Sequence, residues 1–210
     1  MERMTKKDTE AFDFFRCWEH KKYIENLLLF SVAPVLTGAK PSALVSLERC
    51  CKDVWSKQEQ YIGQTVGLSV LELHESRSRF SVLIFDEAAL LVRLNTPSAK
   101  NVLFSYGYSA DANLAELLAH LKRRFGECRF PHEIGVFLGY PPEDVDAFIK
   151  KSGKDYLCSR YWKVYHNEEG ARETFRFIDK AKNIEAADST RMGRCRRFQL
   201  CELPCFLRRC

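Results

Sequence analysis

Two strand-like runs between residues 66 and 85 constrain the fold of this chain more than any other feature of its sequence. The runs "VGLSVLELH" and "RFSVLIF" are rich in valine, leucine and phenylalanine, and they flank the polar stretch "ESRS". Apolar, partly β-branched runs joined by a short polar connection predict a β-hairpin. We therefore expect a hairpin near residues 66–85, with the other elements arranged around it.

Helix signals dominate the remainder of the chain. Apolar residues at helical spacing follow capping residues such as Asp86, Thr96 and Asn167. The predicted helical segments are 8–29, a short turn at 31–36, 48–62 ended by Gly63, 87–94, 96–106, a stripe that begins after Asp111, a pair at 130–153, and a helix after 167. Short runs at 43–47 and 160–166 indicate two further strands. This order predicts an α+β fold, in which several helices cover a small mixed or antiparallel β-sheet of about four strands.

The positive charge of the chain is concentrated at its end. The formal net charge is +5, and residues 191–210 contain six arginines and one glutamate, so the residues before them sum to zero. We expect a single α+β domain at 1–186 and a poorly ordered tail, rich in arginine and cysteine, at 187–210. Nucleic-acid binding is therefore an alternative for the tail and is not expected of the domain.

The cysteines indicate the compartment. There are nine of them, and an odd number argues against a disulfide framework. The start, "MERMTKKDTEAFDFFRCW", differs from a secretory signal, and no apolar run is long enough to span a membrane, so we expect a cytoplasmic protein. Metal binding by the tail is an alternative to a merely disordered tail. Cys201 and Cys205 form one pair with a zinc-like spacing, and the other two tail cysteines lie outside that pair. The candidate metal ligands are Cys195, Cys201, Cys205 and Cys210.

A sharp corner is predicted at residues 130–153, "FPHEIGVFLGYPPEDVDAFIKKSG". Gly139 suits a left-handed position after one helix, and Pro141-Pro142 suits the entry to the next. This pattern matches a helix-turn-helix coarsely. However, the second helix begins with three carboxylates, which suit the helix dipole but repel the phosphates of DNA. We therefore interpret the segment as a structural corner.

Several strings of the chain resemble a known family. "FPHEIGVFLGYPPEDVDAFI" and "YLCSRYWKVYHNEEGA", with "APVLTGAKPSALVSL" upstream and the Gly-Tyr pair at 107–108, are similar to the clostridial and related Firmicutes family called domain of unknown function 3793. The resemblance covers about residues 20–180. It implies a cytosolic bacterial protein of a family without an established activity, and it supplies no catalytic residues. Ser31 stands where we expect cysteine in this family, and the tail after residue 190 lies beyond the pattern.

Four residues are candidates for catalysis. His132 follows Pro131 at a predicted helix start and could act as a general base, with Glu133 beside it. Ser31 or Cys158 could then serve as the nucleophile. Each residue also has a structural interpretation, since His132 and Glu133 can fix the corner and Ser31 can cap a helix.

A second set of residues is suited to a ligand or a partner. Lys40 lies in the small-residue loop "TGAKPS", which lacks the glycines of a phosphate-binding loop. Aromatic residues with a nearby arginine suit planar ligands. The candidate binding residues are Lys40, His132, Tyr140, Arg160, Trp162 and Tyr165.

These observations favour a non-enzymatic accessory module that binds a small ligand or a protein partner. The first alternative is a hydrolase or transferase built on the four catalytic candidates. The second is nucleic-acid binding through the arginine-rich tail. The sequence leaves the cofactor, if there is one, unassigned.

Overall fold

The computed structural model describes residues 22–128 and 130–191 of the chain. Its centre is a three-stranded antiparallel sheet of β1 (Ser42–Glu48), β2 (Ser69–Glu75) and β3 (Arg79–Phe85), in the order β1-β3-β2. The predicted hairpin is confirmed as β2 and β3, and the predicted strand at 43–47 is β1. The expected α+β class is therefore confirmed, with two further short strands outside this sheet.

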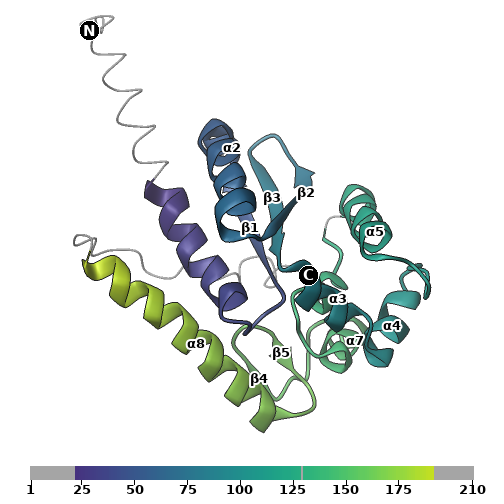
Figure 1. The fold of residues 1–210 in the computed structure, drawn as a ribbon. Helices are drawn as coiled ribbons and strands as arrows, with labels where there is room; N and C mark the ends of the chain where they lie inside the picture. Colours follow the sequence, from purple (N-terminus) through teal and green to yellow (C-terminus); the bar gives the residue numbers. More distant parts are fainter. Residues whose placement is uncertain (1–21, 129, 192–210) are drawn as a thin grey trace, which may run out of the picture.

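Both faces of the sheet are buried, which makes the fold three layers deep (Figure 1). Side chains alternate along each strand, so that neighbours enter different cores. One core lies against the helix at 22–36 and α2 (Lys52–Tyr61), and receives Val45, Val82 and Ile84. The opposite core receives Leu44, Leu83 and Phe85. Burial on both faces explains why the strands read as apolar runs rather than as an apolar–polar alternation.

The second core is closed by a series of helices after the hairpin. They are α3 (Glu87–Leu94), α4 (Pro97–Phe104), α5 (Leu114–Glu127), α6 (Ile134–Phe137) and α7 (Pro142–Lys150). The predicted caps of the first two are confirmed, because Asp86 and Thr96 accept hydrogen bonds from the backbone of their helices. The expected start of α5 at Asp111 is wrong, since Asn113 forms a capping box there with Glu116.

Two predicted breaks in the first core do not occur. The helix at 22–36 continues through Ser31 and Pro34, where a break and a separate turn were expected. Its buried residues Ile24, Leu28, Val32 and Val35 form one stripe, and their packing outweighs the cost of an interior proline. Similarly, α2 runs into a π-helical segment, η2 (Ile62–Val66), so Gly67 rather than Gly63 takes the left-handed conformation.

The last part of the chain forms a third, smaller core. Two short strands, β4 (Cys158–Ser159) and β5 (Lys163–Val164), pair antiparallel and lie against α8 (Glu168–Arg191) (Figure 1). The single strand expected at 160–166 is therefore wrong. Residues 160–162 instead form the turn between β4 and β5, and β5 ends where the next backbone N–H groups, of Tyr165 and His166, donate to the buried carboxylate of Asp144.

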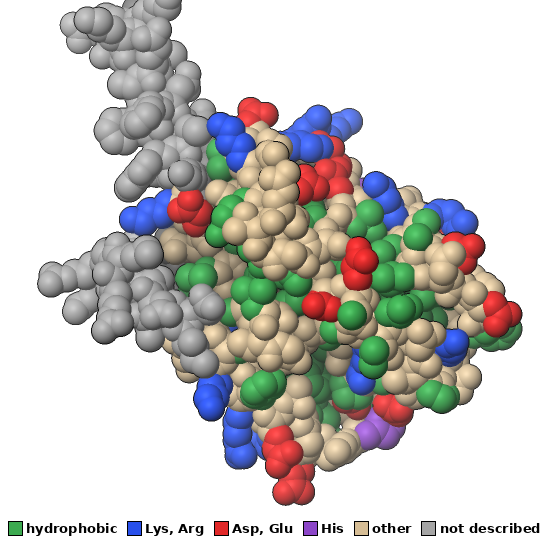
Figure 2. Space-filling model, in the orientation of Figure 1, with side chains coloured by type: hydrophobic (Ala, Val, Ile, Leu, Met, Phe, Trp, Pro, Cys, Tyr) green, Lys and Arg blue, Asp and Glu red, His purple; other side chains and the backbone are tan. Residues whose placement is uncertain are grey.

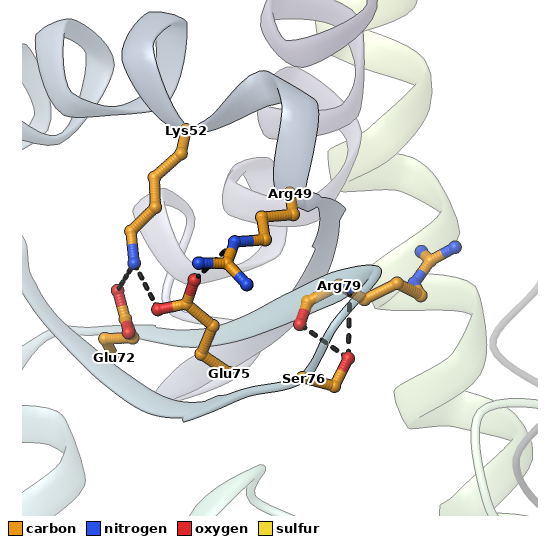
Figure 3. Close-up of polar contacts among 6 residues, drawn as sticks. All are labelled: Arg49, Lys52, Glu72, Glu75, Ser76 and Arg79. Carbon is orange, nitrogen blue, oxygen red and sulfur yellow. Dashed lines mark hydrogen bonds and ion pairs between the residues drawn. The ribbon is translucent and has the colours of Figure 1, made fainter.

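An ion cluster ties the start of α2 to the outer strand β2 (Figure 3). Arg49, in the short 3-10 helix η1 (Arg49–Cys51), places its Nε 3.1 Å from Glu75 Oε1. Lys52 pairs with the same carboxylate and, at 3.6 Å, with Glu72. These side chains are partly exposed, so each pair contributes little to stability. Their main effect is that basic groups here are already neutralised by neighbouring acids.

Candidate ligand-binding site

Three segments that are far apart in the sequence meet where the third core joins the rest of the fold. They are the loop at 37–41, the corner between α6 and α7, and the β4–β5 hairpin. The strings that carry the family resemblance include all three segments. Their meeting point brings together three of the predicted binding residues, namely Lys40, Tyr140 and Trp162.

The loop and the corner are in direct contact. Gly139 has a φ of +81°, which confirms the predicted left-handed position, and a Cβ built on it would lie 2.5 Å from Pro41 Cδ. Ser42 Oγ donates to the carbonyl of Phe137 at 2.9 Å, and this contact is fully buried. Arg93 of α3 donates through Nη2 to the carbonyls of Gly139 and Tyr140, at 3.1 and 2.9 Å. The backbone around Tyr140 is therefore held from two sides.

Asp144 joins the corner to the hairpin. Its side chain is 3 % exposed, and Oδ2 accepts from Trp162 Nε1 at 2.9 Å. Oδ1 accepts from the backbone N–H groups of Tyr165 and His166, at 2.8 and 3.1 Å, and lies 3.1 Å from His166 Nδ1. Sequence reasoning attributed this carboxylate to the helix dipole alone. Nothing in the local pattern indicated that it would orient Trp162.

The result is a lysine–aromatic stack of Lys40, Tyr140, Trp162 and Phe175. The rings of Tyr140 and Trp162 are stacked, with centroids 5.2 Å apart and an interplanar angle of 27°. Phe175 of α8 meets Trp162 edge-on at 4.5 Å. Lys40 Nζ lies 5.3 Å from the centroid of the Tyr140 ring, within the range of a cation–π contact.

Lys40 is electrostatically unusual within this stack. Burial of the side chain, with a smaller contribution from Lys182, lowers the pKa of Lys40 from 10.5 to about 8. Among the described residues, no carboxylate pairs with its ammonium group. Burial also raises the pKa of the Tyr140 phenol, so that this hydroxyl keeps its proton at neutral pH. The stack thus offers a ligand one desolvated cation, the Lys40 ammonium group, and one O–H donor, the Tyr140 hydroxyl.

We predict that Lys40→Met stabilises the free protein at neutral pH. The folded-state pKa of about 8 lies below the ordinary 10.5, so the folded state binds the proton more weakly than the unfolded state does. The resulting penalty is fully present below pH 8 and disappears as the pH rises to 10.5. The melting temperature of the variant should exceed that of the wild type at pH 7, with a difference that shrinks between pH 8 and 10. A variant that is less stable at pH 7 would contradict this.

The other predicted binding residues lie around the stack or elsewhere. Arg160 Nη2 is 2.9 Å from Asp179 Oδ2 on α8, so its charge is already paired. Tyr165 is 8 % exposed, and its buried hydroxyl has no hydrogen-bond partner among the residues that the structure describes. The imidazole of His132 packs between Phe130 and Phe148, with centroids 5.8 and 5.2 Å away.

The four catalytic candidates are not joined to one another by hydrogen bonds in the described part of the chain. Burial lowers the pKa of His132, which favours a neutral imidazole, and burial raises the pKa of the Cys158 thiol. Glu133 is 1 % exposed and accepts from Arg124 Nε at 2.8 Å. Ser31 lies inside the helix at 22–36, so its predicted role as a cap is wrong. Their catalytic use stays a prediction.

The face drawn in Figure 2 does not present a basic patch of the kind that binds nucleic acid. Figure 2 shows acidic and basic side chains interspersed over one face. At the start of α7, Asp144 is buried, and Asp146 pairs with Lys150 at 2.7 Å. The arginine-rich tail lies outside the described residues, as do Cys195, Cys201, Cys205 and Cys210. No helix within 22–128 or 130–191 combines the length and apolar character needed to cross a membrane.

Comparison with models of known families tests the family resemblance that the sequence strings suggest. The model of the family described as "Protein of unknown function (DUF3793)" matches residues 28–195. The chain belongs to the DUF3793 family. The matched region of this DUF3793 protein includes the whole lysine–aromatic stack and the Asp144 anchor. Searches of the curated proteins and of the solved structures find no match to the chain.

Proposed function

We propose that this DUF3793 protein is a non-enzymatic binding module whose lysine–aromatic stack takes a small anionic ligand, with a carboxylate or phosphate group on Lys40. The observation that carries this proposal is the half-buried ammonium of Lys40, which has no described carboxylate partner. A cation taken out of water normally pairs with an anion, because its desolvation is otherwise uncompensated. A ligand anion would supply the missing charge.

The surroundings of Lys40 support a ligand of modest size. The stack is built from the loop at 37–41, the corner and the hairpin, and its aromatic members are held by Asp144 and α8. Tyr140 is only partly buried, so part of its side chain can contact a bound molecule, whereas Trp162 is 6 % exposed and serves as support. The same chemistry would suit an acidic side chain of a protein partner.

Binding should follow the charge on Lys40. The amine is mostly protonated below pH 8 and loses its proton as the pH rises through that value. We predict that affinity for an anion is highest below pH 8 and falls by up to about tenfold per pH unit above it. Because the bound anion favours the charged amine, binding near pH 8 should take up a proton. Calorimetry in buffers of different ionisation enthalpy would detect this uptake.

A thermal-shift screen with inorganic phosphate, nucleotides and small carboxylates, followed by calorimetry, tests the proposal. A ligand at 100 times its Kd stabilises the folded state by about 2.7 kcal/mol. Lys40→Met should abolish the shift. Lys163→Met is the matched control, since Lys163 also lies over aromatic rings but donates to the carbonyl of Gly153 at 2.7 Å. Equal anion binding by Lys40→Met and the wild type would refute the proposed site.

A further inference from the structure

We infer that the Lys40 amine is a nucleophile that condenses with the carbonyl group of a small anionic aldehyde or keto acid to form a Schiff base. This inference rests on the site of the proposed function, but it adds covalent reactivity to non-covalent binding. It follows from how the amine is held. Lys40 is partly buried, whereas Lys151, whose Nζ also lies 5.3 Å from a tyrosine ring, is exposed.

The first argument is the absence of an oxygen acceptor on Lys40. Lys52 Nζ contacts Glu72 and Glu75, Lys150 Nζ contacts Asp146, and Lys163 Nζ donates to a backbone carbonyl. Such contacts favour the protonated, unreactive ammonium. Within the described residues, Lys40 Nζ instead faces the ring of Tyr140, which carries no negative charge and offers no oxygen acceptor to the ammonium group.

The second argument is the charge near Lys40. The charged neighbour that affects it is another cation, Lys182, on α8. A desolvated lysine beside a second cation is a known arrangement for an activated amine, because both effects favour the neutral form. The lowered pKa of Lys40 agrees with this geometry. The side chain is only partly buried, so a small solute can reach it.

The reaction balances without a cofactor. The neutral amine attacks the carbonyl carbon, and a proton moves from nitrogen to oxygen to give a carbinolamine. Loss of water then forms the C=N bond, so that the products are the imine and one molecule of water. Tyr140 keeps its phenolic proton and can donate a hydrogen bond to the oxygen of the reacting compound. The positive potential of Lys182 favours a carbonyl compound that carries a negative charge.

Reductive trapping of the full-length protein tests the inference. The protein is incubated with glyoxylate and sodium cyanoborohydride, and modified lysines are located and timed by peptide mass spectrometry. At pH 7 an amine with a pKa of about 8 has roughly three hundredfold more of its neutral form than one at 10.5. Allowing for the lower intrinsic nucleophilicity of a weaker base, we expect Lys40 to be modified at least about tenfold faster than Lys163.

Two controls distinguish this inference from the proposed function. Lys40→Arg keeps the cation but cannot form an imine, so it should bind phosphate or a carboxylate while losing the trapped adduct. Propionaldehyde, an uncharged probe, should modify Lys40 more slowly than glyoxylate does. Modification of Lys40 at the same rate as Lys163 would overturn the inference, whatever the anion binding. Fast modification of Lys40 in a protein that binds no anion would support the nucleophile and refute the proposed function.

Discussion

The free energy of unfolding is expected to fall by about 2–4 kcal/mol when Gly139 is replaced by alanine. The left-handed backbone, with a φ of +81°, accounts for about 1 kcal/mol of this loss. The larger part comes from packing, because the new methyl group would lie 2.5 Å from Pro41 Cδ and would push the loop away from the corner. Urea unfolding measures the change directly, and the melting temperature should fall by roughly 5–15 °C.

A second glycine separates the two contributions to this loss. Gly67 has a similar φ of +74°, but a Cβ built on it meets nothing within 4 Å. Gly67→Ala should therefore show the backbone cost alone, about 1 kcal/mol. If both variants lose the same stability, then the contact between Gly139 and Pro41 does not constrain the fold. Gly139→Ala should also weaken anion binding, because it displaces the loop at 37–41, which carries Lys40.

Replacing Asp144 with alanine is expected to cost about 3–5 kcal/mol. The variant leaves the Trp162 indole N–H and the backbone N–H of Tyr165 without their acceptor in a buried site. Each orphaned donor costs about 1–3 kcal/mol, and hydrogen bonds to a charged acceptor are stronger than neutral ones. Because Trp162 supports the ring of Tyr140, the same variant should lose anion binding at temperatures where it is still folded.

Asp146 on the same helix provides the control for this substitution. Its carboxylate pairs with the exposed Lys150 in an i,i+4 contact, and such pairs contribute little. Asp146→Ala should change stability by no more than about 0.5 kcal/mol. Asp144→Asn should lie between the two, because the amide keeps one acceptor oxygen but turns its NH₂ group toward a donor. If Asp144→Ala and Asp146→Ala give similar unfolding curves, then Asp144 does not hold the β4–β5 hairpin to the corner.

Much of the candidate site could be anticipated as separate residues, but not as an arrangement. Lys40, Tyr140 and Trp162 were each predicted to bind a ligand or a partner, on the basis of loop composition or aromatic content. The sequence separates them by up to 122 positions, and no local periodicity links them. Arg160 was predicted with them, yet it is paired with Asp179 on α8. Folding brings a carboxylate to Arg160 and none of the described carboxylates to Lys40, and the local sequence does not reveal this difference.

The elements that were predicted correctly have causes that act within a few residues. Apolar runs joined by a short polar connection specify the β2–β3 hairpin, and side-chain caps mark the starts of α3 and α4. At two places where prediction was wrong, a distant contact outweighed a local signal. The helix at 22–36 passes through Pro34 because its stripe packs on the sheet, and the strand expected at 160–166 ends at Val164, where the next backbone N–H groups donate to Asp144.

By itself, the sequence determined the α+β class, the hairpin, the corner at Gly139 and the family, because each is encoded in short strings and local backbone preferences. Only the tertiary structure decided the chemistry of the site. The pKa of Lys40 depends on desolvation and on Lys182 of α8, and the orientation of Trp162 depends on Asp144 of α7. Burial and charge act through space, so residues with ordinary local patterns acquire these properties only when the three segments meet.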